Sequence, residues 1–230
     1  FSGNEMIGKF VAGNDFNYVQ AHATSIAASG KYNISSCSSE VIASGRVQMK
    51  NYQAVDLING LERHDGYTHA YFKSFTPALQ NSIRQYASQG GRILISGSYT
   101  GSDMQTEEEQ AFLSDILKLS YEPTGSTAIT REINPEDSTV TERDSIVYTS
   151  PNVKGLGLQF SYYNELNAQH YAATHPEILK PVGNYAFTAM QYDTGTSAAV
   201  AYKSTTYRSF VMGFPLECII DERTDRKSVV

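Results

Sequence analysis

The sequence contains no tryptophan, only two cysteines and no long apolar segment. Its 230 residues are 40% hydrophobic and 18% charged, which excludes an intrinsically disordered chain. No apolar run approaches the roughly 18 residues that a membrane-spanning helix requires. The formal net charge is −6, and no basic cluster stands out along the sequence. These features argue against a membrane-spanning protein and against a generic nucleic-acid binder.

The two cysteines, Cys37 and Cys218, form neither a disulfide framework nor a metal-binding motif. We expect two separate buried thiols, and a single bridge between them stays open if the protein is exported. The chain carries 25 Ser and 18 Thr but only nine Lys, a composition that favours a periplasmic, cell-surface or secreted bacterial protein. The first residues contain no targeting signal. We therefore expect a domain from a longer chain, whose other domains are its partners.

Strand and helix patterns alternate in the first half of the sequence. The spacing predicts strands at 9–12, 32–35, 53–59 and 92–97, and helices at about 14–29, 76–90 and 106–119. This order predicts an α/β fold with a mainly parallel sheet flanked by helices.

The second half has a different pattern. Residues 120–155 are polar and rich in turns, and β-like runs follow at 158–163, 185–192, 197–203 and 209–214. We expect one domain over 1–230, in which 120–184 is a polar insertion with added strands. The last two runs should form an antiparallel C-terminal extension of the sheet.

The most informative segment is the turn that follows the predicted strand at 92–97. Tyr99 lies between Gly97 and Gly101, in a Gly-x-nucleophile-x-Gly arrangement. This turn and the strand at 53–59 resemble the class I glutamine amidotransferase-like superfamily. The resemblance implies a flavodoxin-like or amidotransferase-like fold. It also implies a catalytic Cys at this turn and a late His-Pro-Glu group.

Both catalytic positions depart from the family pattern. Tyr99 stands at the position of the Cys, and Phe214-Pro215 stands where the family has His-Pro, although Glu217 remains nearby. A Cys–His mechanism needs both partners, so the resemblance implies a degenerate, non-catalytic member without a cofactor. The run from Gly13 to Asp103 also resembles a domain of secreted Bacteroides-type proteins labelled xanthan lyases. We therefore expect a non-catalytic module of an exported polysaccharide-processing or cell-surface protein, supporting domain assembly or glycan contact.

A polysaccharide lyase or hydrolase domain is the alternative. Its candidate catalytic residues are Tyr99, Ser98, His64 and Glu62, from the 97–103 turn and the 62–69 loop, with Arg63 neutralising a uronate carboxylate. The loop also holds Asp65 and His69, but its spacing matches no zinc motif, so no metal site is expected.

A third segment offers a candidate sugar-binding surface. Tyr162, Tyr163 and Asn164 are residue types that stack on sugars and hydrogen-bond to them. Alternate tyrosines also pack one face of a strand, and this interpretation stays open, as does a small-molecule pocket kept without its chemistry.

Overall fold

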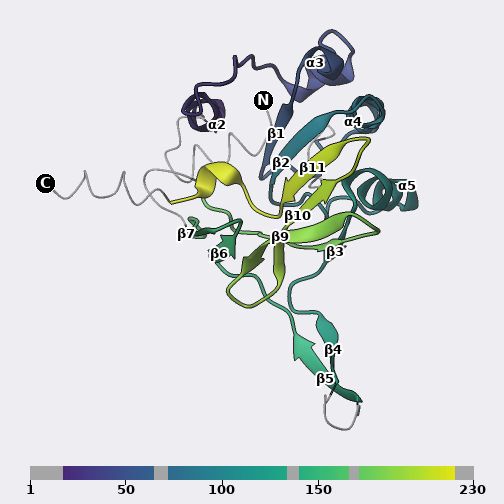
Figure 1. The fold of residues 1–230 in the computed structure, drawn as a ribbon, viewed down its shortest axis with the longest axis vertical. Coiled ribbons are helices and arrows are strands. Elements are labelled where there is room, and N and C mark those ends of the chain that lie inside the picture. The colour runs from purple at the N-terminus through teal and green to yellow at the C-terminus, as the bar shows by residue number, and fades with distance from the viewer. Residues whose placement is uncertain (1–17, 65–71, 134–139, 166–170, 221–230) are drawn as a thin grey trace, which may run out of the picture.

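The computed structural model describes residues 18–64, 72–133, 140–165 and 171–220. Its α-helices are few and short, and Figure 1 places most of them at one side of the strands. They are α2 (Tyr18–Ala27), α3 (Ser39–Ala43), α4 (Pro77–Ser88) and α5 (Glu107–Phe112). Short helical turns are η1 (Met49–Asn51), the π-helical η2 (Leu113–Leu117) and η3 (Leu216–Cys218).

A seven-stranded mixed sheet forms the centre of the molecule, in the order β1-β2-β11-β10-β9-β6-β7. Strands β1, β2 and β11 run parallel, and every later pairing is antiparallel. The strands of this sheet are β1 (Val55–Gly60), β2 (Arg92–Gly97), β6 (Asn152–Gly155), β7 (Leu158–Ser161), β9 (Ala186–Tyr192), β10 (Ser197–Lys203) and β11 (Arg208–Met212).

Two small antiparallel pairs complete the strands. Strand β3 (Leu119–Glu122) pairs with β8 (Ile178–Pro181) beside the main sheet. Strands β4 (Thr127–Ile133) and β5 (Val140–Ile146) form a hairpin that projects from the body as an arm in Figure 1.

The predicted parallel, flavodoxin-like α/β fold is wrong. The sheet is mixed, curls into a half-barrel and carries few helices. The physical reason lies in the connections. The link from β10 to β11 is a four-residue hairpin turn, whereas a parallel pair needs a crossover of a dozen or more residues. The segments treated as an extension and an insertion therefore contribute more of the sheet than its parallel part does.

Two other local predictions fail. Residues 32–35 form no strand; Tyr32 and Ile34 are exposed and lie in an irregular stretch. The two thiols are indeed unbridged, but Cys37 is exposed and only Cys218 is buried. The predicted strand at 9–12 lies outside the described residues.

The helices begin where the sequence supplies caps. The Thr76 hydroxyl accepts a hydrogen bond from the Leu79 N–H, and Pro77 occupies the first turn of α4. Helix α5 begins with a capping box between Thr106 and Glu109. The predicted helix at 106–119 changes to a π-helical turn after Phe112 and ends at Lys118, whose backbone is left-handed.

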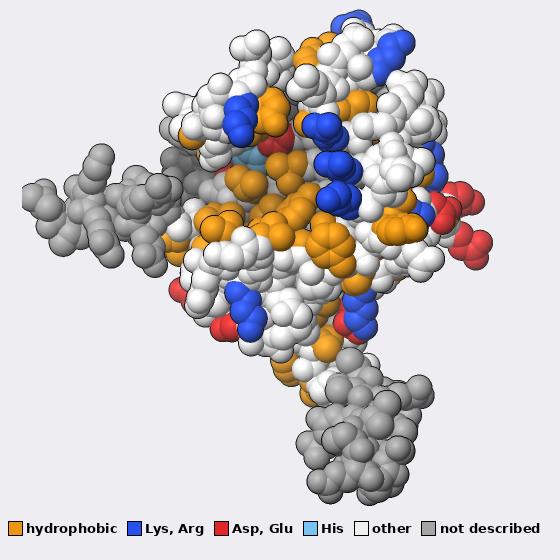
Figure 2. All heavy atoms as spheres, viewed as in Figure 1, with side chains coloured by type: hydrophobic (Ala, Val, Ile, Leu, Met, Phe, Trp, Pro, Cys, Tyr) orange, Lys and Arg blue, Asp and Glu red, His pale blue; other side chains and the backbone are white. Residues whose placement is uncertain are grey.

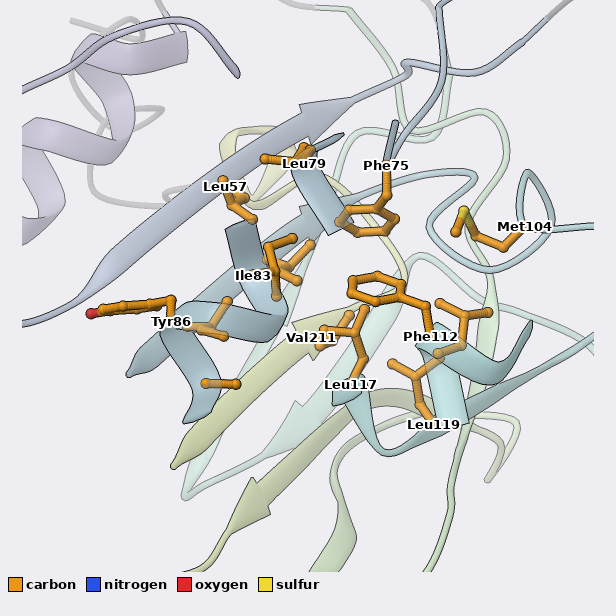
Figure 3. Close-up of a cluster of buried hydrophobic side chains, with 14 of the residues drawn as sticks. Leu57, Phe75, Leu79, Ile83, Tyr86, Met104, Phe112, Leu117, Leu119 and Val211 are labelled. Carbon is orange, nitrogen blue, oxygen red and sulfur yellow. The ribbon is translucent and has the colours of Figure 1, made fainter. Parts of the chain in front are cut away.

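The sheet separates two hydrophobic clusters. On one face, α4 and α5 pack on β1, β2 and β11, and Figure 3 shows their side chains meeting. The rings of Phe75 and Phe112 lie 5.4 Å apart at the centre of this cluster. The second cluster lies on the opposite face and is rich in aromatic residues: Tyr192 at the end of β9, and Tyr162, Tyr171 and Phe214 from the loops. This second face is covered by loops and α2 instead of a helical layer.

Candidate functional site

The Gly97–Gly101 turn lies at the carboxyl end of β2, as the sequence predicted. Tyr99 has a positive φ of 61°, a backbone conformation that non-glycine residues adopt rarely. No helix follows directly, because residues 101–103 form a turn and α5 begins only at Glu107. Helix α5 thus begins where the sequence predicted a helix, six residues beyond Gly101.

Two backbone donors of the turn, the N–H groups of Gly101 and Ser102, are bound by an internal carboxylate. The Glu177 carboxylate accepts hydrogen bonds from Gly101 N–H (2.6 Å), from Ser102 N–H (2.9 Å) and from the Ser102 hydroxyl. Burial raises the pKa of Glu177, and these three donors oppose part of that effect. In a hydrolase, such amides would receive the oxyanion of a substrate. Here an internal carboxylate occupies them.

Residues 62–64, the described part of the 62–69 loop, are held against this turn. Buried Asp103 accepts hydrogen bonds from His64 N–H (3.0 Å) and Ser74 N–H (2.9 Å). The Ser74 hydroxyl donates to the carbonyls of Glu62 and Tyr99. Asp103 and Ser74 therefore clamp the loop to the turn. Asp65 and His69 lie outside the described residues.

A partly exposed cluster surrounds the Tyr99 ring. The Arg63 guanidinium lies 4.7 Å from the ring centroid, and the His175 ring lies 5.0 Å away at an interplanar angle of 31°. Burial raises the pKa of Tyr99, with Arg63 acting in the opposite direction. Burial and then the charge of Arg63 lower the pKa of His175. Both shifts favour the neutral forms, so the phenol is a poor base and His175 a poor acid.

Two other candidate residues are placed unfavourably for catalysis. Ser98 is fully buried, and its hydroxyl has no hydrogen-bond partner among the described residues. Tyr162 is also buried; its ring stacks on Phe214 at 4.7 Å, and its hydroxyl donates to the Ser150 carbonyl. Tyr162 therefore packs the core and offers no surface for a sugar. Tyr163 is half-buried and Asn164 is exposed.

Glu217 does contact an imidazole, which the sequence interpretation missed. The His22 ring on α2 bridges Asp56 (Nδ1 to Oδ2, 2.7 Å) and Glu217 (Nε2 to Oε2, 3.1 Å). Burial alone would lower the pKa of His22, but the hydrogen bonds and charges of the two carboxylates outweigh it and raise the pKa to about 9. Tyr171 donates a further hydrogen bond to Glu217.

This His22 network is unsuited to proton abstraction. With both ring nitrogens bound to carboxylates, the protonated imidazole has no free lone pair to accept a proton. No signal in the sequence links residues 195 positions apart, and α2 looked like an ordinary amphipathic helix. Glu177 and His175 were missed for the same reason, since they follow a loop with no recognisable motif.

No group of three or more His, Cys, Asp or Glu side chains could hold a metal ion within the described ranges. None of the described helices is long and apolar enough to cross a bilayer.

Comparison with known proteins gives little. No family model and no curated protein matches the sequence. Among solved structures, an exo-beta-1,4-mannosidase from Opitutaceae bacterium strain TAV5 is similar over 62% of this chain, at 14% identity and a TM-score of 0.34. The match covers 20% of the mannosidase chain. A likeness this distant carries no argument about fold or function.

Proposed function

We propose that this chain is a non-catalytic module of an exported bacterial polysaccharide-processing or cell-surface protein, acting through contacts with other domains or with glycan. The observation that carries the non-catalytic part is the Glu177 carboxylate bound to the Gly101 and Ser102 amides. A substrate oxyanion would have to displace a buried side chain that already satisfies these donors. The hydroxyl-rich composition supports the exported setting.

The state of the nearby titratable groups supports the same proposal. Tyr99 and His175 favour their neutral forms, and His22 is fixed between two carboxylates. A general base needs an accessible lone pair and a pKa near the working pH. His175 beside the turn is exposed and favours its neutral form, but its Nδ1 is hydrogen-bonded with the Thr174 hydroxyl and its ring faces the Tyr99 ring. Among the described residues, no hydrogen bond joins His175 to the hydroxyl of Tyr99 or Ser98.

The test is an assay of the purified chain on glutamine, on simple esters and on acidic polysaccharides, beside a Tyr99→Phe variant. We expect no turnover by either protein. Turnover that disappears in Tyr99→Phe, while the variant unfolds at the same temperature, would refute the proposal.

A polysaccharide lyase remains the second candidate function, because Arg63 lies over Tyr99 and could neutralise a uronate carboxylate there. Lyase action would produce an unsaturated sugar that absorbs ultraviolet light. Wild type, Arg63→Gln and Tyr99→Phe should then differ in the rate at which this absorbance appears. Identical flat traces for all three would eliminate this candidate.

A further inference from the structure

The second face of the main sheet leaves a hydrophobic area exposed. Ile58 on β1, Leu94 on β2 and Phe210 on β11 are half-buried and lie in neighbouring strands, and Phe187 on β9 is 47% exposed. Figure 2 shows hydrophobic side chains gathered across the middle of this face of the molecule. We call these four residues the open patch. Contiguous apolar area of this kind marks an interaction site more often than a free surface.

A row of cations borders the open patch. Arg92 pairs in register with Arg208, and Arg208 pairs in register with Lys203, so the three lie side by side on β2, β11 and β10. Arg92 lies two positions from Leu94 and Arg208 lies two positions from Phe210, which places each pair on one face of the sheet. Lys203 shares that face because it pairs in register with Arg208. Figure 2 shows a column of basic side chains beside the hydrophobic area. We call these three residues the basic row.

The positive charges of the basic row are not paired with any carboxylate in the described part of the chain. All three side chains are exposed, and none forms an ion pair with another described residue. Neighbouring strands lie about 4.8 Å apart, and like charges directly opposite one another destabilise a sheet. The row is also opposite in sign to the chain, whose net charge is −6. An arrangement that costs stability and runs against the overall charge calls for a complementary ligand.

We infer that the open patch and the basic row together dock a protein partner that presents an apolar ridge flanked by Asp or Glu carboxylates. The four patch residues are aliphatic and phenylalanine side chains, which pack on apolar groups and offer a sugar no hydrogen bond. One tyrosine borders the row: Tyr185 is 72% exposed, lies two positions from Phe187, and its carbonyl accepts a hydrogen bond from Lys203 N–H. Because four side chains of this surface are apolar and only one carries a hydroxyl, a protein ridge fits it better than a glycan does. The two guanidinium groups can each bind a carboxylate through two parallel hydrogen bonds. The inference deepens the proposed assembly role and rests on it.

The test uses synthetic amphipathic helical peptides, measured by fluorescence anisotropy with the whole chain. One peptide has a leucine ridge flanked by glutamates, and its matched partner has the same ridge flanked by lysines. We expect the glutamate peptide to bind and the lysine peptide not to bind. Binding should weaken as salt concentration rises, because exposed ion pairs are screened.

Three variants locate the binding site. Arg208→Glu should weaken binding of the glutamate peptide by about tenfold or more, because it reverses the central charge of the row. Phe187→Ser should weaken it through the patch, at a position exposed enough to tolerate the change. The control is Lys154→Glu, an exposed β6 residue with the same charge change, whose neighbour Val153 faces the second core cluster. It should leave binding unchanged.

Arg208→Glu provides a second, independent readout. The new carboxylate lies between Arg92 and Lys203, so two repulsive neighbours become attractive ones. We expect the variant to unfold at a temperature about 1 to 3 °C higher than wild type. Loss of binding in a more stable protein cannot come from misfolding.

Four results would overturn the inference. These are equal binding of both peptides, absence of any binding, and competition by polyglutamate or polygalacturonate as strong as by the glutamate peptide, which would identify a polyanion site. The fourth is a dimer that Arg208→Glu dissociates in sedimentation, since a second copy would then cover the face. None of these results bears on turnover, so failure here is distinct from failure of the non-catalytic proposal.

Discussion

The bridge of His22 between Asp56 and Glu217 predicts a specific dependence of stability on pH. The ring is buried, and its pKa in the folded protein is raised from 6.5 to about 9. Folding therefore favours the protonated imidazole. The resulting stabilisation is fully present below pH 6.5 and is lost as the pH rises through 9.

The size of the effect follows from the shift. Each pKa unit corresponds to 1.36 kcal/mol, so the full contribution of His22 is about 3 kcal/mol. This is a large part of the 5 to 15 kcal/mol by which domains are typically stable. The groups that face the ring are Asp56 on β1 and Glu217 on η3, with Tyr171 behind Glu217 and its ring 5.0 Å from that of Tyr18 on α2. Weakening this network should release α2 first.

The assay is urea unfolding at a series of pH values from about 5.5 to 9.5. Wild type should lose about 3 kcal/mol more stability over this range than His22→Gln, whose side chain does not titrate. Subtracting the variant removes the contribution of the tyrosines and of Cys218. A proton NMR titration should place the His22 midpoint near pH 9 and that of His175 below 6.5, since burial lowers the latter pKa. Parallel stability curves for wild type and variant, or a His22 midpoint at or below 6.5, would refute the assignment.

Three further predictions test other parts of the structure. Glu177→Ala should lower the unfolding free energy by about 2 to 4 kcal/mol, because the Gly101 and Ser102 amides lose their buried acceptor. Urea unfolding that is unchanged in the variant would show that water replaces the carboxylate without loss of stability. Thr106→Ala should lower the unfolding free energy by about 1 kcal/mol, because it removes the capping box of α5. The control is Ser88→Ala, which removes an exposed hydroxyl that donates to the Gln85 carbonyl of its own helix. Equal losses of unfolding free energy in the two variants would contradict the cap. A thiol reagent should label one cysteine rapidly in the native protein and the second only on unfolding, because Cys37 is exposed and Cys218 is buried; two rapid labels would contradict the packing of Cys218.

Local signals predicted the individual elements of the fold better than they predicted their arrangement. The caps at Thr76 and Thr106 and the apolar strand at 92–97 all lie where the sequence places them. The direction of a strand could not be predicted in this way, because it depends on which edge of the sheet the strand joins. Strand β11 lies between its hairpin partner β10 and strand β2, whose Arg92 is 116 positions from its register partner Arg208. No periodicity in the sequence encodes that choice.

The candidate site divides in the same way. Residues 62–64 and the 97–103 turn lie together because both follow the carboxyl ends of parallel strands, a relation that the predicted strands at 53–59 and 92–97 make accessible from the sequence. The sequence could not identify Glu177, because the segment that carries this residue has no recognisable pattern. The contact depends on tertiary placement alone, as does that of His22 with Glu217.

These buried contacts explain why the turn and the open patch differ in their capacity to bind a ligand. At the turn, four backbone donors meet internal carboxylates: Gly101 and Ser102 donate to Glu177, and His64 and Ser74 donate to Asp103. A ligand would gain little there, because it would replace hydrogen bonds that already exist. At the basic row the opposite holds, since three neighbouring cations form no ion pair with any residue that the structure describes, and the adjoining side chains are partly exposed. The free energy available for binding therefore lies on the sheet face and not at the turn.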